Sequence, residues 1–114
     1  MRTRESSPMR LALDAAGRAS SMGEVPVGAV VVEAQGTVLA CAHNRVETDR
    51  DPTAHAEILA LREAARRRGS PRLTDCDLYV TLEPCPMCAQ AIAMARIRRL
   101  YFGAADPKGG GVEH

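Results

Sequence analysis

The sequence has very little aromatic material, since its 114 residues include two Tyr, one Phe and no Trp. A core must therefore be built from Ala, Val, Leu and Ile. The hydrophobic share of 46% excludes a disordered tail as the main content of the chain, and the length suits one domain with one modest core. We expect a single domain over residues 1–114, whose small core would gain stability from a partner subunit.

Long apolar runs are also missing. No segment approaches the roughly 18 apolar residues that a membrane span requires, and residues 1–8 lack the apolar stretch of a signal peptide. The sequence thus predicts a cytoplasmic protein with no membrane partner. In that reducing compartment, the four cysteines are better interpreted as thiols or metal ligands than as disulfides.

A strong charge imbalance is absent as well, because 15 Lys and Arg face 14 Asp and Glu. The net charge of +1 neither suggests nor excludes a polyanionic partner. Basic residues gather within 62–72 and 96–99, where they are either solvated helix ends or phosphate contacts. Glu24 and Asp14 are interpreted as surface charges, and Glu63 is expected to pair with Arg67 one helical turn away.

Hydrophobic periodicity predicts an α/β protein in which helices and strands alternate. Apolar residues at three- and four-residue spacings indicate helices, whereas Val-rich or alternating runs indicate strands. The helices are expected at residues 9–19, 54–68 and 85–96, and the strands at 25–32, 37–44, 77–82 and 100–103. This order predicts a partly parallel sheet with helices on both faces.

The expected strand at 37–44 alternates in polarity, which assigns Leu39, Cys41 and His43 to one face and leaves Asn44 at the strand end. In such sheets, ligands collect beyond the carboxyl ends of the strands, where the following helices begin. The two helices at 54–68 and 85–96 are expected to begin there, and both carry a motif at their first turn.

The first motif is Thr53-Ala54-His55-Ala56-Glu57, and the second is Pro84-Cys85-Pro86-Met87-Cys88. Neither is decisive alone, because His-x-Glu is common by chance and Cys-x-x-Cys also occurs in redox pairs and structural zinc sites. Together they match the His-x-Glu and Pro-Cys-x-x-Cys signature of zinc deaminases. The sequence therefore predicts one Zn²⁺ per chain, held by His55, Cys85 and Cys88.

The residue types suit this chemistry. Three protein ligands leave a fourth zinc position for water, whose pKa the metal lowers toward about 7. Cys85 and Cys88 lie on one face of a helix start, where the backbone amides favour thiolates. Glu57 is predicted to accept the proton of that water, to protonate the ring nitrogen and then to protonate the departing amine. Ammonia leaves, and an oxo group replaces it.

Two structural alternatives remain open at this point. Cys41 and Cys76 could complete a closed four-cysteine zinc site, although they are expected in or before strands, away from helix starts. A thioredoxin-like redox pair would leave His55 and Glu57 unexplained. His43 is interpreted as a packed or exposed strand residue rather than a ligand.

The stretch 24–108 resembles the bacterial tRNA-specific adenosine deaminases of the cytidine/deoxycytidylate deaminase superfamily. The matching segments are 24–30, 44–45, 51–57, 79–85, 95–97 and 102–104, with Asp106 and Lys108. The resemblance implies a three-layer α/β/α fold around a mixed five-stranded sheet, a homodimer, and inosine formation at the wobble position of a tRNA anticodon stem-loop. It further implies that Asn44, Pro26, Asp106 and Lys108 bind the substrate.

The resemblance is incomplete at one end, because family members continue beyond the glycine run at 109–111 into another strand and a C-terminal helix. We therefore expect the fold to lack both. The alternative within enzymes is a deaminase of a free base or nucleoside such as guanine or cytosine, since the zinc chemistry is shared. A non-catalytic, zinc-stabilised binding module is a third interpretation, which Glu57 disfavours.

Overall fold

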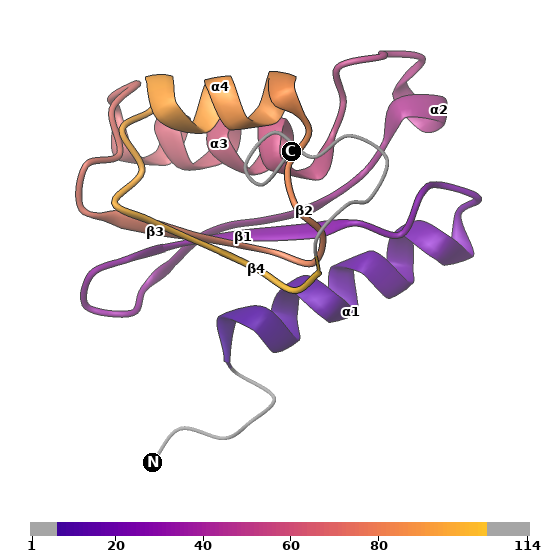
Figure 1. Ribbon diagram of the computed structural model, residues 1–114, viewed down its shortest axis with the longest axis horizontal. Helices are drawn as coiled ribbons and strands as arrows, with labels where there is room; N and C mark the ends of the chain where they lie inside the picture. The colour runs from indigo at the N-terminus through magenta and orange to yellow at the C-terminus, as the bar shows by residue number, and fades with distance from the viewer. Residues whose placement is uncertain (1–6, 105–114) are drawn as a thin grey trace.

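The computed structural model describes residues 7–104, whose four strands form one mixed sheet in the order β2-β1-β3-β4 (Figure 1). The strands are β1 (Gly28–Glu33), β2 (Val38–His43), β3 (Cys76–Val80) and β4 (Arg99–Phe102). Strand β1 runs antiparallel to both β2 and β3, whereas β3 and β4 are parallel. The prediction of a mixed, partly parallel sheet is confirmed.

Helices cover both faces of this sheet. Helix α1 (Pro8–Ser21) lies on one face, while α3 (Ala56–Arg68) and α4 (Pro86–Met94) lie side by side on the other, which confirms the three-layer α/β/α arrangement (Figure 1). The sequence gives no signal for a short helix, α2 (Val46–Asp49). Four residues, none of them buried, carry no hydrophobic period that could indicate a helix.

The core is aliphatic, as the scarcity of aromatic residues predicts. The larger cluster of buried side chains lies between the sheet and helices α3 and α4, and a smaller one lies beneath α1. Both are built mainly from Ala, Val and Leu. Within the described residues, no helix is both long and apolar enough to cross a lipid bilayer.

The alternation predicted for residues 37–44 is wrong at Leu39. Val31 pairs with Ala40 and Val32 pairs with Val38, so Leu39 is the extra residue of a β-bulge. The bulge places the Leu39 side chain in the same cluster as Ala40 instead of with Cys41. The expected strand at 25–32 is also too long, because β1 begins at Gly28.

Several arginines of the two basic clusters are bound within the chain. Arg68 bridges Glu33 and Asp75 at 2.6 and 2.7 Å, and Arg98 forms a two-pronged pair with Asp77. The predicted Glu63–Arg67 pair is wrong. Glu63 pairs with Arg66, and Arg67 instead donates to the Leu39 carbonyl at 2.9 Å.

Helix α1 approaches β1 unusually closely because its buried face consists of small residues, namely Ala12, Ala15, Ala16 and Ala19. A Cβ atom on Gly28 would lie 1.9 Å from the Ala12 carbonyl oxygen and 2.8 Å from the Ala16 amide nitrogen. Gly28 is therefore required by the contact between two backbones.

We predict that Gly28→Ala lowers the free energy of unfolding by about 1–3 kcal/mol, because α1 must move away from the sheet. Gly17→Ala is the matched control. Gly17 lies exposed within α1, and a Cβ atom added there would meet no atom within 4 Å. This control should stabilise the protein by about 0.5–1 kcal/mol through helix propensity. Urea unfolding of both variants measures the difference, and equal shifts would contradict a requirement for glycine at position 28.

Candidate metal centre and pocket

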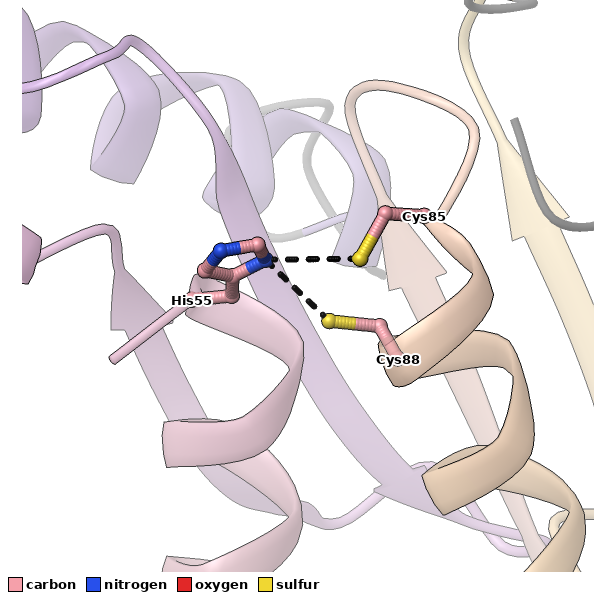
Figure 2. A group of neighbouring side chains, drawn as sticks. All are labelled: His55, Cys85 and Cys88. Carbon is pink, nitrogen blue, oxygen red and sulfur yellow. Dashed lines mark hydrogen bonds between the residues drawn. The ribbon is translucent and has the colours of Figure 1, made fainter. Parts of the chain in front are cut away.

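The side chains of His55, Cys85 and Cys88 converge between the first turns of α3 and α4 (Figure 2). Their ligand atoms all lie within 4.8 Å of one another. His55 Nδ1 lies 3.6 Å from Cys85 Sγ and 3.4 Å from Cys88 Sγ. The structure thus brings together the three residues that the two motifs single out.

Sheet register explains why the two motifs meet. Gly28 pairs with His43 and Ala29 pairs with Val80, so the carboxyl ends of β2 and β3 lie at the same edge of the sheet. The chain passes from β2 through α2 into α3, and it passes from β3 directly into α4. Both helices therefore begin above that edge, as expected for a ligand site in a sheet of this kind.

The backbone conformation at the starts of α3 and α4 directs the side chains of the three ligands toward one another. His55 and Cys85 are the N-cap residues of α3 and α4, both extended, and neither makes a side-chain capping hydrogen bond. Pro86 occupies the first helical position, where its missing N–H costs nothing. Cys88 follows Cys85 by three residues, so the two cysteines lie on the same face of the helix start. Both thiols thus lie at the electropositive end of α4, which favours thiolates.

The donor set fits zinc. Tetrahedral zinc with Zn–S bonds of about 2.3 Å and Zn–N bonds of about 2.0–2.1 Å separates nitrogen and sulfur ligands by about 3.6 Å. The two measured separations, 3.4 and 3.6 Å, agree with that value. Two thiolates and one imidazole leave one position for water or substrate, as in catalytic zinc sites.

The electrostatic surroundings of the three ligands also favour binding of a cation. Burial raises the pKa of the Cys88 thiol, and the neighbouring Glu57 carboxylate and Cys85 thiol raise it further. Without a positive ion, these groups would oppose one another's ionisation in a buried place. A divalent cation among the ligands removes that conflict, because it stabilises thiolates directly.

Glu57 lies in the first turn of α3, two residues after His55, and is buried. Burial is the largest influence on its carboxyl group and raises its pKa, against the opposing effects of its own backbone amide and of His55. A carboxyl with a raised pKa exchanges protons more readily near neutral pH. Glu57 thus has the position and the chemistry of a proton carrier beside the metal ligands.

A pocket of about 340 Å³ opens beside this centre. Its wall comes from the segment after α1, the end of β2, helix α2, the first turn of α3 and the loop after β3. The lining residues are Gly23, Glu24, Val25, Val27, Asn44, Val46, Glu47, His55, Glu57, Leu82, Glu83 and Cys85. A substrate in the pocket would therefore meet two of the three ligands and Glu57.

Asn44 is buried and directly follows β2, which ends at His43, one residue before the predicted end. Its Oδ1 accepts a hydrogen bond from the Ala56 backbone N–H at 2.7 Å, which caps the first turn of α3. Within residues 7–104, no acceptor is found for the Nδ2 group of Asn44. Because Asn44 lines the pocket, that amide is left to donate into it.

The other residues considered as substrate contacts or metal ligands are Pro26, Asp106, Lys108 and His43. Pro26 is exposed and does not line the pocket, although its neighbours Val25 and Val27 do. Asp106 and Lys108 lie outside the described residues. His43 is a half-buried strand residue that donates from Nδ1 to the Asn44 carbonyl at 2.9 Å, in agreement with its interpretation as a non-ligand.

Cys41 and Cys76 do not belong to the metal centre. The Cys41 thiol is exposed near α1, with the Leu11 carbonyl 4.0 Å away. Cys76 is buried at the start of β3, and burial raises the pKa of its thiol to about 11. Among the described residues, the potential metal ligands that cluster are His55, Cys85 and Cys88. A closed four-cysteine site is thereby excluded.

The interpretation of Glu24 as a surface charge is wrong. Glu24 is a buried carboxylate that accepts hydrogen bonds from the N-terminal turn of α2, and hydrogen bonding from Thr48 lowers its pKa. The glycine before it could have indicated this, because glycine after the last turn of a helix often ends the helix and turns the chain back toward the protein. Gly23 does so at the end of α1, with φ 77°.

A three-layer fold with a His-Cys-Cys centre and an adjacent buried carboxylate defines the zinc-dependent nucleobase deaminases. The family model described as the cytidine and deoxycytidylate deaminase zinc-binding region matches residues 2–104, and the chain belongs to this family. Within it, the similar sequences include proteins named tRNA-specific adenosine deaminase. Those of Agrobacterium fabrum and Aquifex aeolicus are 57% and 52% identical over 105 and 104 residues.

These alignments cover 92% and 91% of this chain and 68% of each relative. A solved structure from a study of A-to-I editing by tRNA:A34 deaminases superimposes with a TM-score of 0.90 at 57% identity, covering 93% of this chain and 76% of the other. A guanine deaminase from Bacillus subtilis gives 0.84 at 39% identity, with coverages of 91% and 66%. The similarity is thus greater to the tRNA enzymes.

We predict that Cys88→Ser reduces bound zinc well below one ion per chain and lowers thermal stability, since metal binding and folding are coupled. Cys41→Ser is the matched control, because Cys41 is exposed and lies outside the centre. It should keep both properties. Metal analysis of the purified proteins decides the matter, and an unchanged zinc content in Cys88→Ser would rule out this ligand set.

Proposed function

We propose that the protein deaminates adenosine to inosine hydrolytically at the wobble position of a tRNA anticodon, using one Zn²⁺ per chain. The observation that carries the proposal is the convergence of His55, Cys85 and Cys88 beside buried Glu57 at the wall of a pocket. The similarity to proteins named tRNA-specific adenosine deaminase supplies the substrate.

Zinc, when bound, supplies a hydroxide nucleophile at neutral pH. The chain's residues do the rest. His55, Cys85 and Cys88 would hold the metal. Glu57 accepts one proton of the attacking water and passes it to the ring nitrogen next to the reacting carbon, and it then carries the second proton of that water to the departing amine. The carbon–nitrogen bond to the amine breaks, a carbon–oxygen bond takes its place, and ammonia leaves.

The pocket suits a single base rather than a stacked strand. Its volume of about 340 Å³ lies at the small end of ligand sites, which span about 300–1,000 Å³. An adenine must therefore leave the stack of the anticodon loop to reach Glu57. The Nδ2 donor of Asn44, which has no acceptor among residues 7–104, can then hydrogen-bond a ring nitrogen of the base, because its Oδ1 is already engaged by Ala56.

Guanine deamination is the second candidate. It is favoured by the structural likeness to the Bacillus subtilis guanine deaminase, although the 39% identity to that protein is lower than the 57% identity to the tRNA enzyme. The pocket and the metal centre alone suit either purine. The choice of tRNA thus rests on the comparisons, together with Asp106 and Lys108, which the family resemblance assigns to substrate binding.

The homodimer and the cytoplasmic location also remain proposals. Support for a second copy comes from an apolar groove between α3 and α4, lined by Ile58, Leu61, Arg62, Ala65, Pro71, Ala91, Met94 and Ala95, in which Met94 is 68% exposed. Apolar surface of this kind is commonly covered by a partner. Sedimentation equilibrium of the purified protein tests the association.

The proposed reaction predicts inosine formation in an anticodon stem-loop with adenosine at the wobble position, and much slower ammonia release from guanine, adenosine and cytidine. Glu57→Gln is the control, because it should retain zinc and the fold while losing turnover. Faster release from guanine would favour the second candidate. Ammonia release from no substrate, with zinc bound, would support a non-catalytic binding module.

Asn44 allows two roles to be separated. Asn44→Asp keeps an oxygen for the Ala56 N–H but lacks the amide donor, so we predict nearly normal stability and a loss of about 1–3 kcal/mol in kcat/KM. Asn44→Ala removes both groups, and should additionally destabilise the fold by about 1–3 kcal/mol. Unfolding and initial-rate measurements on the two variants test this. Identical behaviour of both variants would refute the division of labour.

A further inference from the structure

Helix α2 forms part of the pocket wall but has little to hold it in place. Val46 and Glu47 line the pocket, yet none of the residues of α2 is buried. A helix of four residues is unstable by itself, because nucleation is costly and few internal hydrogen bonds repay it. Its N-cap residue, Arg45, makes no side-chain capping bond, and the pair that Arg45 forms with Asp49 at 3.0 Å is an exposed contact within the same segment. The position of α2 must therefore be maintained from elsewhere.

Glu24 supplies that support across more than twenty residues of sequence. Its Oε1 accepts from the Glu47 backbone N–H at 3.3 Å, and its Oε2 accepts from the Thr48 backbone N–H at 2.7 Å and from Thr48 Oγ1 at 2.6 Å. An ionised carboxylate is well suited to three converging donors, since it accepts through both oxygens and donates nothing. The negative charge also faces the positive end of α2.

The end of α1 fixes Glu24 in turn. The Gly23 N–H donates to the Ser20 carbonyl and the Glu24 N–H donates to the Ala19 carbonyl, with Gly23 in the left-handed conformation. This is a Schellman-type helix end, which gives the chain a defined exit direction. The carboxylate is buried, and hydrogen bonding from Thr48 holds its pKa below the usual value. Glu24 thus joins α1, which packs on the sheet through four buried alanines, to α2, which has no buried residue.

The contact between Glu24 and α2 joins two parts of the pocket wall. Gly23, Glu24 and Val25 line one part of the pocket, and Val46 and Glu47 line another. The segment that includes α2 runs from the proposed base contact, Asn44, to the metal ligand His55. That segment is closed at its base by a hydrogen bond from the Arg45 N–H to the Ala54 carbonyl at 2.9 Å. Movement of α2 alone would therefore open the pocket while this hydrogen bond keeps His55 in place.

We propose that Glu24 is a positioning residue that holds α2 in place as a wall of the substrate pocket. The identity of the substrate rests on the proposed function, whereas the role of Glu24 in holding α2 does not. A wall that is held in place lowers the cost of ordering the pocket when substrate binds. Loss of Glu24 should then weaken substrate capture, whereas the metal centre and Glu57, both carried by α3 and α4, continue to work.

Hydrogen exchange tests the structural half in the protein alone. The Asp49 N–H donates to the Arg45 carbonyl and the Asp51 N–H donates to the Val46 carbonyl, so neither bond includes Glu24. In Glu24→Ala, both amides should exchange on the order of tenfold faster, because charge-assisted hydrogen bonds that hold α2 closed are lost. Unchanged exchange at these two amides would overturn the proposal.

Steady-state kinetics on the anticodon stem-loop test the functional half. Glu24→Ala should raise KM on the order of tenfold while kcat and zinc content stay near the wild-type values. Glu24→Gln, which keeps one carbonyl oxygen for Thr48, should be intermediate. Asp14→Ala is the matched control, since Asp14 is an exposed carboxylate of α1 paired with Arg10 at 3.5 Å. A fall in kcat at constant KM would contradict a positioning role.

The outcomes separate the two proposals. A wild-type protein that binds zinc but leaves the stem-loop unchanged overturns the proposed function, and the exchange experiment still decides whether Glu24 holds α2. If Glu24→Ala does not fold, Thr48→Val removes one of the three donors and provides the milder test. It should move exchange and KM in the same direction by a smaller factor.

Discussion

Three ligand atoms within 4.8 Å of one another, contributed by helices that begin thirty residues apart, impose the strictest constraint on this fold. Ionised thiols and the neighbouring Glu57 carboxylate repel one another at this partly buried place, and a cation offsets that repulsion. The sheet register brings the two helix starts to one edge, and the helix N-termini supply favourable amide dipoles. The rest of the site is arranged around that edge.

Two polar residues of the pocket wall, Asn44 and Glu24, are connected to this sheet edge in different ways. Asn44 extends from the end of β2 and caps α3 with one oxygen, so the same side chain supports the helix that carries His55 and faces the pocket. Glu24 extends from the end of α1 and holds α2. Two polar side chains that cap helices therefore help to position the pocket wall, whose lining also includes the apolar residues Val25, Val27, Val46 and Leu82.

The features that could be predicted from the sequence are those with a local pattern. His55 and Glu57 lie in the first turn of one helix, Cys85 and Cys88 lie in the first turn of another, and each pair belongs to a short motif. The strand before Asn44 could also be predicted, although its alternation fails at Leu39. The features that could not be predicted arise from tertiary contacts. Leu39 changes face through a bulge, and Glu24 is buried by a helix whose four residues show no period. Arg67 binds a β2 carbonyl in place of Glu63.

The central claim is an open zinc site with one nitrogen and two sulfur ligands from the protein. X-ray absorption at the zinc edge of the purified protein tests it most directly. We expect two sulfur atoms at about 2.3 Å and two light atoms at about 2.0–2.1 Å, of which one belongs to His55 and one to water. A shell of four sulfur atoms, or a protein that binds no zinc at all, would contradict it.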